Sequence, residues 1–174
     1  MTSEVRSTTR SAQKARTRQA LLDAAIGVIR EQGLGAATAR AISDRAGVAA
    51  GTFFVHFPEV SALVDELLDQ HIERVLGRAY RSLPEDATLV ESLVHVGDAL
   101  FAGYAKEADL ARSFLSATMF RVGPDGPSSA RLAGFRAWVM ARMVRARASG
   151  ELSPAIDLDM AFESFFCLYL GLVI

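Results

Sequence analysis

The stretch that decides the fold runs from Thr38 to Leu63 and reads TARAISDRAGVAAGTFFVHFPEVSAL. Thr38 can cap a short helix over about residues 39–46, because its hydroxyl can accept a free backbone N–H. Gly47 then permits a turn conformation that a β-carbon disfavours. A second short helix over about 50–56 ends before Pro58, since the residue preceding a proline avoids the α region. Two short helices about a tight glycine-containing turn predict a helix-turn-helix.

The rest of the chain shows helical periodicity and almost no strand signal, so the fold class is expected to be all-α. Further helices are expected over 15–32, 60–82, 88–106, one or two within 109–120, then 128–148 and from 157 onward. The expected organisation is a flexible basic arm over 1–13, a helix-turn-helix domain over 14–74 with its motif at about 37–56, and a helical domain over 75–174. The last helix, which includes Cys167, lacks a polar face and is expected to be buried on both sides.

Composition excludes several classes of protein. The 174 residues are 51% apolar, which is enough for a folded core and argues against general disorder. The polar first 15 residues do not resemble a signal peptide, and the apolar run Phe165 to Ile174 is too short to span a membrane. The single cysteine excludes an internal disulfide and a multi-cysteine metal site, and it fits a reducing cytoplasm. A cytoplasmic protein without a membrane partner is therefore expected.

Charge is distributed unevenly although the net charge is −1. Residues 1–58 hold eight basic and four acidic side chains, whereas residues 59–174 hold eleven basic and sixteen acidic ones. The basic side chains are densest between Val5 and Leu22, where five occur with no acid among them: Arg6, Arg10, Lys14, Arg16 and Arg18. A basic end on an acidic body indicates that this end meets a polyanion. A solvated leader is the alternative for Arg6 and Arg10.

The second helix of a helix-turn-helix fits the DNA major groove, where its outward residues face the base edges. The outward residues expected here are Ala50, Gly51, Phe54 and Val55. Phe54 and Val55 could contact thymine methyl groups or sugars, which are apolar surfaces available in that groove. Phe53 and Phe57 are expected in the core.

At this point the sequence resembles the DNA-binding signature of TetR-type repressors. The positions that match the family pattern are Thr38, Ile42, Ala46, Gly47, Val48, Gly51, Thr52, His56 and Phe57, and in the preceding helix Arg18, Leu21, Leu22, Ala24 and Ala25. A weaker resemblance covers Gly150 to Ala161. The resemblance implies that Thr52 and His56 contact DNA and that Arg40 and Arg45 can meet phosphates. The alternatives are a helix-terminal histidine, a solvated arginine face and, for Arg45, a pair with Asp44 or another acid.

Departures from the family pattern weaken the expected contacts with phosphate. Ala49 replaces a serine cap, Phe54 replaces a tyrosine hydroxyl, and Val60 replaces a lysine. Val55 also stands where another aromatic side chain is common. Backbone N–H groups at the start of the fourth helix and the basic leader are expected to carry more of the binding. Ser43, in place of alanine, is expected to be harmless because it is still small.

The C-terminal half is matched only by its helices, and its roles are those that the resemblance implies. The last two helices would pair with those of a second subunit in a homodimer that reads a palindromic operator in double-stranded DNA. Candidate interface residues are Phe135, Val139, Met143, Phe162, Phe165, Phe166 and Tyr169. Candidate walls of a pocket for a small, largely apolar ligand are Phe101, Tyr104, Phe114, Phe120 and Trp138, with ordinary core packing as the alternative for each. The apolar end Gly171 to Ile174 would be covered by the dimer or continue into further chain.

The predicted function is a DNA-binding regulator, a repressor that a small ligand releases. A helical adaptor that has lost operator binding is the alternative, because Phe54, Val55 and Val60 lack the expected polar groups. An enzyme is not supported, since no nucleophile motif, phosphate loop, metal-ligand spacing or paired carboxylates are present. No catalytic residue, metal or cofactor is predicted, and His71 and His95 are expected to be structural or exposed.

Overall fold

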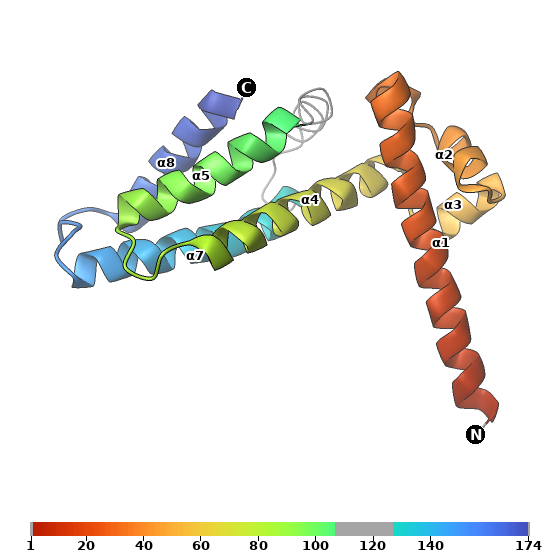
Figure 1. The fold of residues 1–174 in the computed structure, drawn as a ribbon, viewed down its shortest axis with the longest axis horizontal. Helices are drawn as coiled ribbons and strands as arrows, with labels where there is room; N and C mark the ends of the chain where they lie inside the picture. The colour runs from red at the N-terminus through yellow and green to blue at the C-terminus, as the bar shows by residue number, and fades with distance from the viewer. Residues whose placement is uncertain (1, 107–126, 174) are drawn as a thin grey trace. The chain divides into compact units, whose positions relative to one another are not determined.

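The computed structural model describes residues 2–106 and 127–173, and within these ranges it contains helices and no strand (Figure 1). In chain order the elements are α1 (Thr2–Gln32), the 3-10 turn η1 (Leu34–Ala36), α2 (Ala39–Ala46), α3 (Ala50–His56), α4 (Val60–Ser82), α5 (Leu89–Lys106), α7 (Pro127–Ala148) and α8 (Leu158–Val173). The predicted all-α fold is confirmed. The helices expected within 109–120 lie outside the described residues.

The first helix is longer than the sequence pattern predicts. It begins at Thr2 rather than near Ala15, so the leader expected as an arm forms the first turns of α1. No proline or glycine occurs before Gly27, and nothing in the leader therefore interrupts a helix that the core nucleates further along the chain.

Two compact units make up the chain, an N-terminal unit (Met1–Leu67) and a C-terminal unit (Leu68–Ile174). The boundary lies within α4, as does the boundary expected at residue 75. In the N-terminal unit α2 and α3 lie against the C-terminal half of α1 (Figure 1). The side chains that hold them there are almost completely buried: Leu21, Leu22, Ala25, Ile42, Phe53, Phe57 and Leu63. This core fixes the two short helices, which are too short to be stable in isolation.

The C-terminal unit packs the end of α4 with α5, α7 and α8 around one apolar core. Its most buried members include Val96, Leu100, Val139 and Phe162. The expectation that α8 is buried on both sides is wrong for the single chain, because α8 packs through one face only. Leu168 is 71% exposed, and Cys167, expected to be buried, is also exposed. Within the described residues, no helix combines the length and apolar character needed to cross a bilayer.

Candidate nucleic-acid interface

The helix-turn-helix has the local geometry that its sequence predicts. Thr38 is in an extended conformation, and its Oγ1 accepts a hydrogen bond from the Ala41 N–H at 3.1 Å, which caps α2. Gly47 ends α2 in the left-handed conformation, with φ 68°. The N–H of Val48 then bonds back to the Ser43 carbonyl at 3.0 Å. These contacts set the tight turn between α2 and α3, and the predicted cap and turn are both confirmed.

Helix α3 presents an apolar face to the outside. Phe54 is 61% exposed and Val55 is 68% exposed, and Ala50 and Gly51 are exposed beside them. Phe53 is completely buried on the opposite face. The four residues predicted to face outward are therefore exposed, and the predicted core position of Phe53 is confirmed. Thr52 is half-buried, and Ala49 makes no side-chain cap, as its identity predicts.

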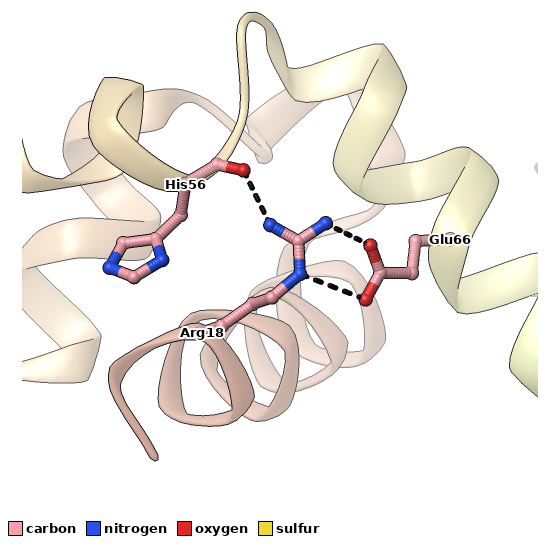
Figure 2. Close-up of polar contacts among 3 residues, drawn as sticks. All are labelled: Arg18, His56 and Glu66. Atoms are coloured by element: carbon pink, nitrogen blue, oxygen red, sulfur yellow. Dashed lines mark hydrogen bonds and ion pairs between the residues drawn. The ribbon is translucent and has the colours of Figure 1, made fainter. Parts of the chain in front are cut away.

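Arg18 joins three segments of the N-terminal unit (Figure 2). Its guanidinium donates from Nε to Glu66 Oε1 at 3.2 Å and from Nη2 to Glu66 Oε2, in a two-bonded pair with α4. Its Nη1 donates to the backbone carbonyl of His56, the last residue of α3. The guanidinium also lies over the Phe57 ring, 4.0 Å from the ring centroid. Sequence reasoning places Arg18 in the basic leader, whereas the structure uses it inside the protein.

His56 lies at the C-terminal end of α3 with a half-buried side chain. Its Nδ1 is buried and has no hydrogen-bond partner among the described residues. Burial lowers the pKa of His56 below 6.5, and the positive charges of Arg18 and Lys14 lower this pKa further. The imidazole is therefore neutral at pH 7 in the free protein.

The two arginines of α2 differ in their surroundings. Arg45 donates two hydrogen bonds of 2.7 Å to Glu31 of α1, and this pairing lowers the pKa of the Glu31 carboxyl. The Arg45 guanidinium lies directly against Gly27, where an added β-carbon would come within 2.4 Å of Nε. Arg40 is 87% exposed and only 3.9 Å from Asp44. Arg45 thus makes the pair with an acid that the sequence left open, while Arg40 extends into solvent.

Aromatic side chains of the C-terminal unit gather between α4, α5, α7 and α8. The hydroxyls of Tyr104 and Tyr169 are 3.0 Å apart, and the Phe101 ring lies 5.7 Å from the Tyr169 ring. Trp138 stacks on Tyr80 with ring centroids 4.6 Å apart. Of the predicted pocket walls, Phe101, Tyr104 and Trp138 are therefore part of one aromatic cluster with Tyr80 and Tyr169. The predicted walls Phe114 and Phe120 lie outside the described residues.

Tyr80 is a residue that sequence reasoning missed. Its hydroxyl oxygen is buried and has no hydrogen-bond partner among the described residues, and burial raises its pKa to about 12. A buried hydroxyl without a partner is unfavourable and suits a site that a polar group of a ligand completes. Tyr80 stands near the end of a helix in an otherwise ordinary apolar pattern, so no local signal marks it.

The residues predicted for a dimer interface fall into two groups. Those buried within the core of their own subunit are Phe135, Val139, Met143 and Phe162. Those half-buried along α8 are Phe165, Phe166 and Tyr169. The first group has little surface left for a partner. Val144, Met160 and Leu168 are large apolar side chains that α7 and α8 expose instead.

Residues 21–67 match the family model of bacterial regulatory proteins of the tetR family. The chain belongs to the TetR family. The matched segment runs from the buried half of α1 through α2 and α3 into α4, so it contains the helix-turn-helix and Glu66 but begins just after Arg18. The predicted resemblance is thereby confirmed.

Curated relatives match the N-terminal part of the TetR-type chain. The transcriptional repressor KstR2 of Rhodococcus jostii is 37% identical over 70 residues, which are 40% of this chain and 34% of the relative. The uncharacterised regulator YvkB of Bacillus subtilis is 31% identical over 100 residues, 53% of each chain. The chain thus spans about a third to a half of the length of these relatives. Both are transcriptional regulators, and neither is described as an enzyme.

Solved structures share the fold over most of the chain. FadR of Bacillus subtilis in complex with stearoyl-CoA has a TM-score of 0.70 and 22% identity, and covers 89% of this chain and 84% of its own. FadR of Thermus thermophilus in complex with lauroyl-CoA has a TM-score of 0.69 and 24% identity, with 90% and 80% covered. At these identities the likeness shows the architecture: an N-terminal helix-turn-helix followed by a helical C-terminal part.

Proposed function

We propose that the chain is a sequence-specific DNA-binding regulator, a repressor that acts as a homodimer on a palindromic operator and is released by a small, largely apolar ligand. The observation that carries this proposal is the exposed face of α3. Phe54 and Val55 project from a helix whose opposite face, through Phe53, is locked in the core. A fixed helix with an exposed face is the arrangement that major-groove recognition requires.

The proposed DNA contacts divide into base-facing and phosphate-facing groups. The base-facing residues are Ala50, Gly51, Thr52, Phe54 and Val55, of which the last two suit thymine methyl groups. Among the phosphate-facing residues, Arg40 has an exposed guanidinium, and His56 can contribute a ring N–H. Thr38 places its backbone at the start of α2, and Arg45 would have to leave Glu31 to reach DNA.

The ligand is proposed to enter the aromatic cluster of the C-terminal unit. Its walls would be Phe101, Tyr104 and Trp138, with Tyr80 and Tyr169 added by the structure. The two FadR proteins of the same architecture were crystallised with stearoyl-CoA and lauroyl-CoA, ligands with long apolar chains. That likeness supports a ligand with an apolar part, and the hydroxyls of the cluster suit one polar group on it.

The homodimer is proposed to form through α7 and α8. The half-buried Phe165, Phe166 and Tyr169 stay in the proposed interface, and the exposed Val144, Met160 and Leu168 extend it. Exposed apolar side chains of this size mark surfaces that a second protein covers. Phe135, Val139, Met143 and Phe162 support the interface from behind, because their own subunit buries them.

The deciding experiment is selection of bound fragments from genomic DNA, followed by a mobility shift with the enriched sequence at stated salt. Val55→Glu places a carboxylate on the exposed face of α3 and is expected to abolish the specific shift. Val94→Glu is the matched control, because Val94 is an exposed valine of α5 and 55% accessible. Equal loss in both variants, or no loss in Val55→Glu, would contradict the assignment of this face to DNA.

The basic first turns of α1 are proposed to add phosphate contacts. A chain lacking residues 1–12 should bind the same fragment with a shallower dependence of log affinity on log salt. Each lost phosphate contact reduces that slope by about 0.9. Equal slopes for the full and shortened chains would remove the leader from the interface.

A helical adaptor without operator binding is the second candidate. It is favoured by the absence of polar groups at Phe54, Val55 and Val60, where the family pattern often provides contacts to phosphate. Failure to enrich any fragment from genomic DNA, with a folded dimer in hand, would select this alternative.

A further inference from the structure

We propose that Arg18 is a positioning residue for DNA recognition, which fixes the C-terminal end of α3 against α4 through Glu66. The inference deepens the proposed function and rests on it. It assigns to one basic residue of the N-terminal segment a role inside the protein, and it assigns to an acidic residue, Glu66, a favourable contribution to binding a polyanion.

The hydrogen bonds of Arg18 leave its guanidinium fully engaged within the protein. Its three nitrogens donate to Glu66 Oε1, Glu66 Oε2 and the carbonyl oxygen of His56 (Figure 2). One face of the guanidinium covers the ring of Phe57. A two-bonded arginine–carboxylate pair fixes the orientation of both partners, which a single-point contact does not. Arg18 therefore holds two consecutive residues at the end of α3 and connects them to α4.

Helix α3 depends on contacts of this kind because its own sequence stabilises it poorly. It has seven residues, well below the length at which an isolated helix is stable. Ala49 provides no side-chain cap at its start. Its end is held by the buried rings of Phe53 and Phe57 and by the charge-assisted bond that Arg18 gives to the His56 carbonyl. A cation at the C-terminal end of a helix also opposes the negative end of the helix dipole.

The positioning role and a direct phosphate contact predict opposite effects of neutralising Glu66. If Arg18 met phosphate, Glu66→Gln would remove a competing negative charge and tighten DNA binding. If Arg18 positions α3, the same substitution loosens the end of the recognition helix and weakens binding, although the protein becomes less negative. The sign of the change separates the two roles.

The matched control is Glu31→Gln. Glu31 also forms a two-bonded pair with an arginine in the N-terminal unit, but it joins α1 to α2 through Arg45 and leaves α3 and α4 untouched. Both substitutions remove one carboxylate charge and keep the side-chain size. Comparison of the two variants therefore cancels the general electrostatic effect on binding to a polyanion.

The experiment measures affinity for the fragment that the wild-type chain selects from genomic DNA, across a series of salt concentrations. Glu66→Gln is expected to bind about tenfold more weakly, equivalent to about 1.4 kcal/mol, with an unchanged salt slope. Glu31→Gln is expected to bind as tightly as wild type or more tightly. Glu66→Gln binding as well as Glu31→Gln, or Arg18→Lys losing affinity together with about one unit of salt slope, would overturn the proposal.

Hydrogen exchange supplies a readout that does not depend on DNA. The Phe57 N–H bonds to the Phe53 carbonyl at 2.9 Å and reports on the end of α3. Its exchange should be faster in Glu66→Gln and unchanged in Glu31→Gln, at a temperature where both variants are folded by circular dichroism. If the wild-type chain selects no DNA, the proposed function fails, and this measurement alone decides whether Arg18 holds α3. Should Glu66→Gln not fold, Glu66→Asp is used, which retains the charge and shortens the reach.

Discussion

Replacing Ser43 with alanine should stabilise the protein. Ser43 lies in α2 and is completely buried, and its hydroxyl oxygen has no hydrogen-bond partner among the described residues. The sequence alone presents this serine as a harmless substitute for alanine, because the two differ by one atom. The structure shows that the extra atom is a polar group without a partner in the core beneath the helix-turn-helix.

The expected gain follows from two contributions. A buried polar group left without a partner destabilises a fold by about 1–3 kcal/mol. Alanine is also the better helix former, by about 0.5 kcal/mol relative to serine. Removal of the hydroxyl leaves a space too small to count as a cavity. We therefore expect Ser43→Ala to raise the free energy of unfolding by about 2 kcal/mol, or the melting temperature by about 4–8 °C for a chain of this size.

Urea denaturation followed by circular dichroism tests this prediction, with Ser92→Ala as the matched control. Ser92 is also completely buried in a helix, but its hydroxyl donates to the Thr88 carbonyl at 2.7 Å. Its removal loses a hydrogen bond and gains helix propensity, so the free energy of unfolding should stay level or fall slightly. The Ser43→Ala variant must also keep the wild-type m-value, because a changed slope reports a different unfolded or native state. No gain at Ser43, or an equal effect at both serines, would refute the reasoning.

Three further predictions test individual contacts. Gly47→Ala should destabilise the protein by about 1–2 kcal/mol in thermal denaturation, because φ is 68° there and the space around a β-carbon is open, so that backbone strain is the whole effect. The lowered pKa of His56 means that the unfolded chain binds more protons below pH 6.5, so the free energy of unfolding should fall between pH 7.5 and 5.5 more steeply in wild type than in His56→Gln. Equal pH dependence in the two proteins would contradict this. Tyr80→Phe should raise the free energy of unfolding by about 1 kcal/mol, because it removes a buried hydroxyl without a partner, and an unchanged or lowered value in urea would speak against that.

The helix-turn-helix was predictable because its signals are local. The cap at Thr38, the left-handed residue at Gly47 and the stop before Pro58 each depend on one residue and its immediate neighbours. Helical periodicity likewise predicted the inward position of Phe53 and the outward position of Phe54. Each of these features follows from backbone preferences that a single sequence expresses directly.

The ion pairs of the N-terminal unit were not predictable, because they join residues that only the tertiary fold brings together. Arg18 and Glu66 are separated by 48 positions, and Arg45 and Glu31 by 14. In the sequence all four are charged residues on exposed-looking helix faces. A charged side chain can equally serve solvent, phosphate or a neighbouring carboxylate, and the choice depends on the approach of α1 to α2 and α4. The same limit hid the burial of the Ser43 hydroxyl.

The C-terminal unit shows a different limit of periodicity. A stripe of apolar residues indicates that a helix face is covered, but it does not indicate whether the cover is the same chain or another one. Val139 and Phe162 satisfy the pattern expected of an interface, yet the core of their own subunit buries them. Val144, Met160 and Leu168 remain exposed on the same two helices. Because a four-helix dimer interface must bury surface that the single chain leaves open, the outward faces of α7 and α8 are the better candidates, and a charged residue at Leu168 should disrupt the dimer more than alanine there.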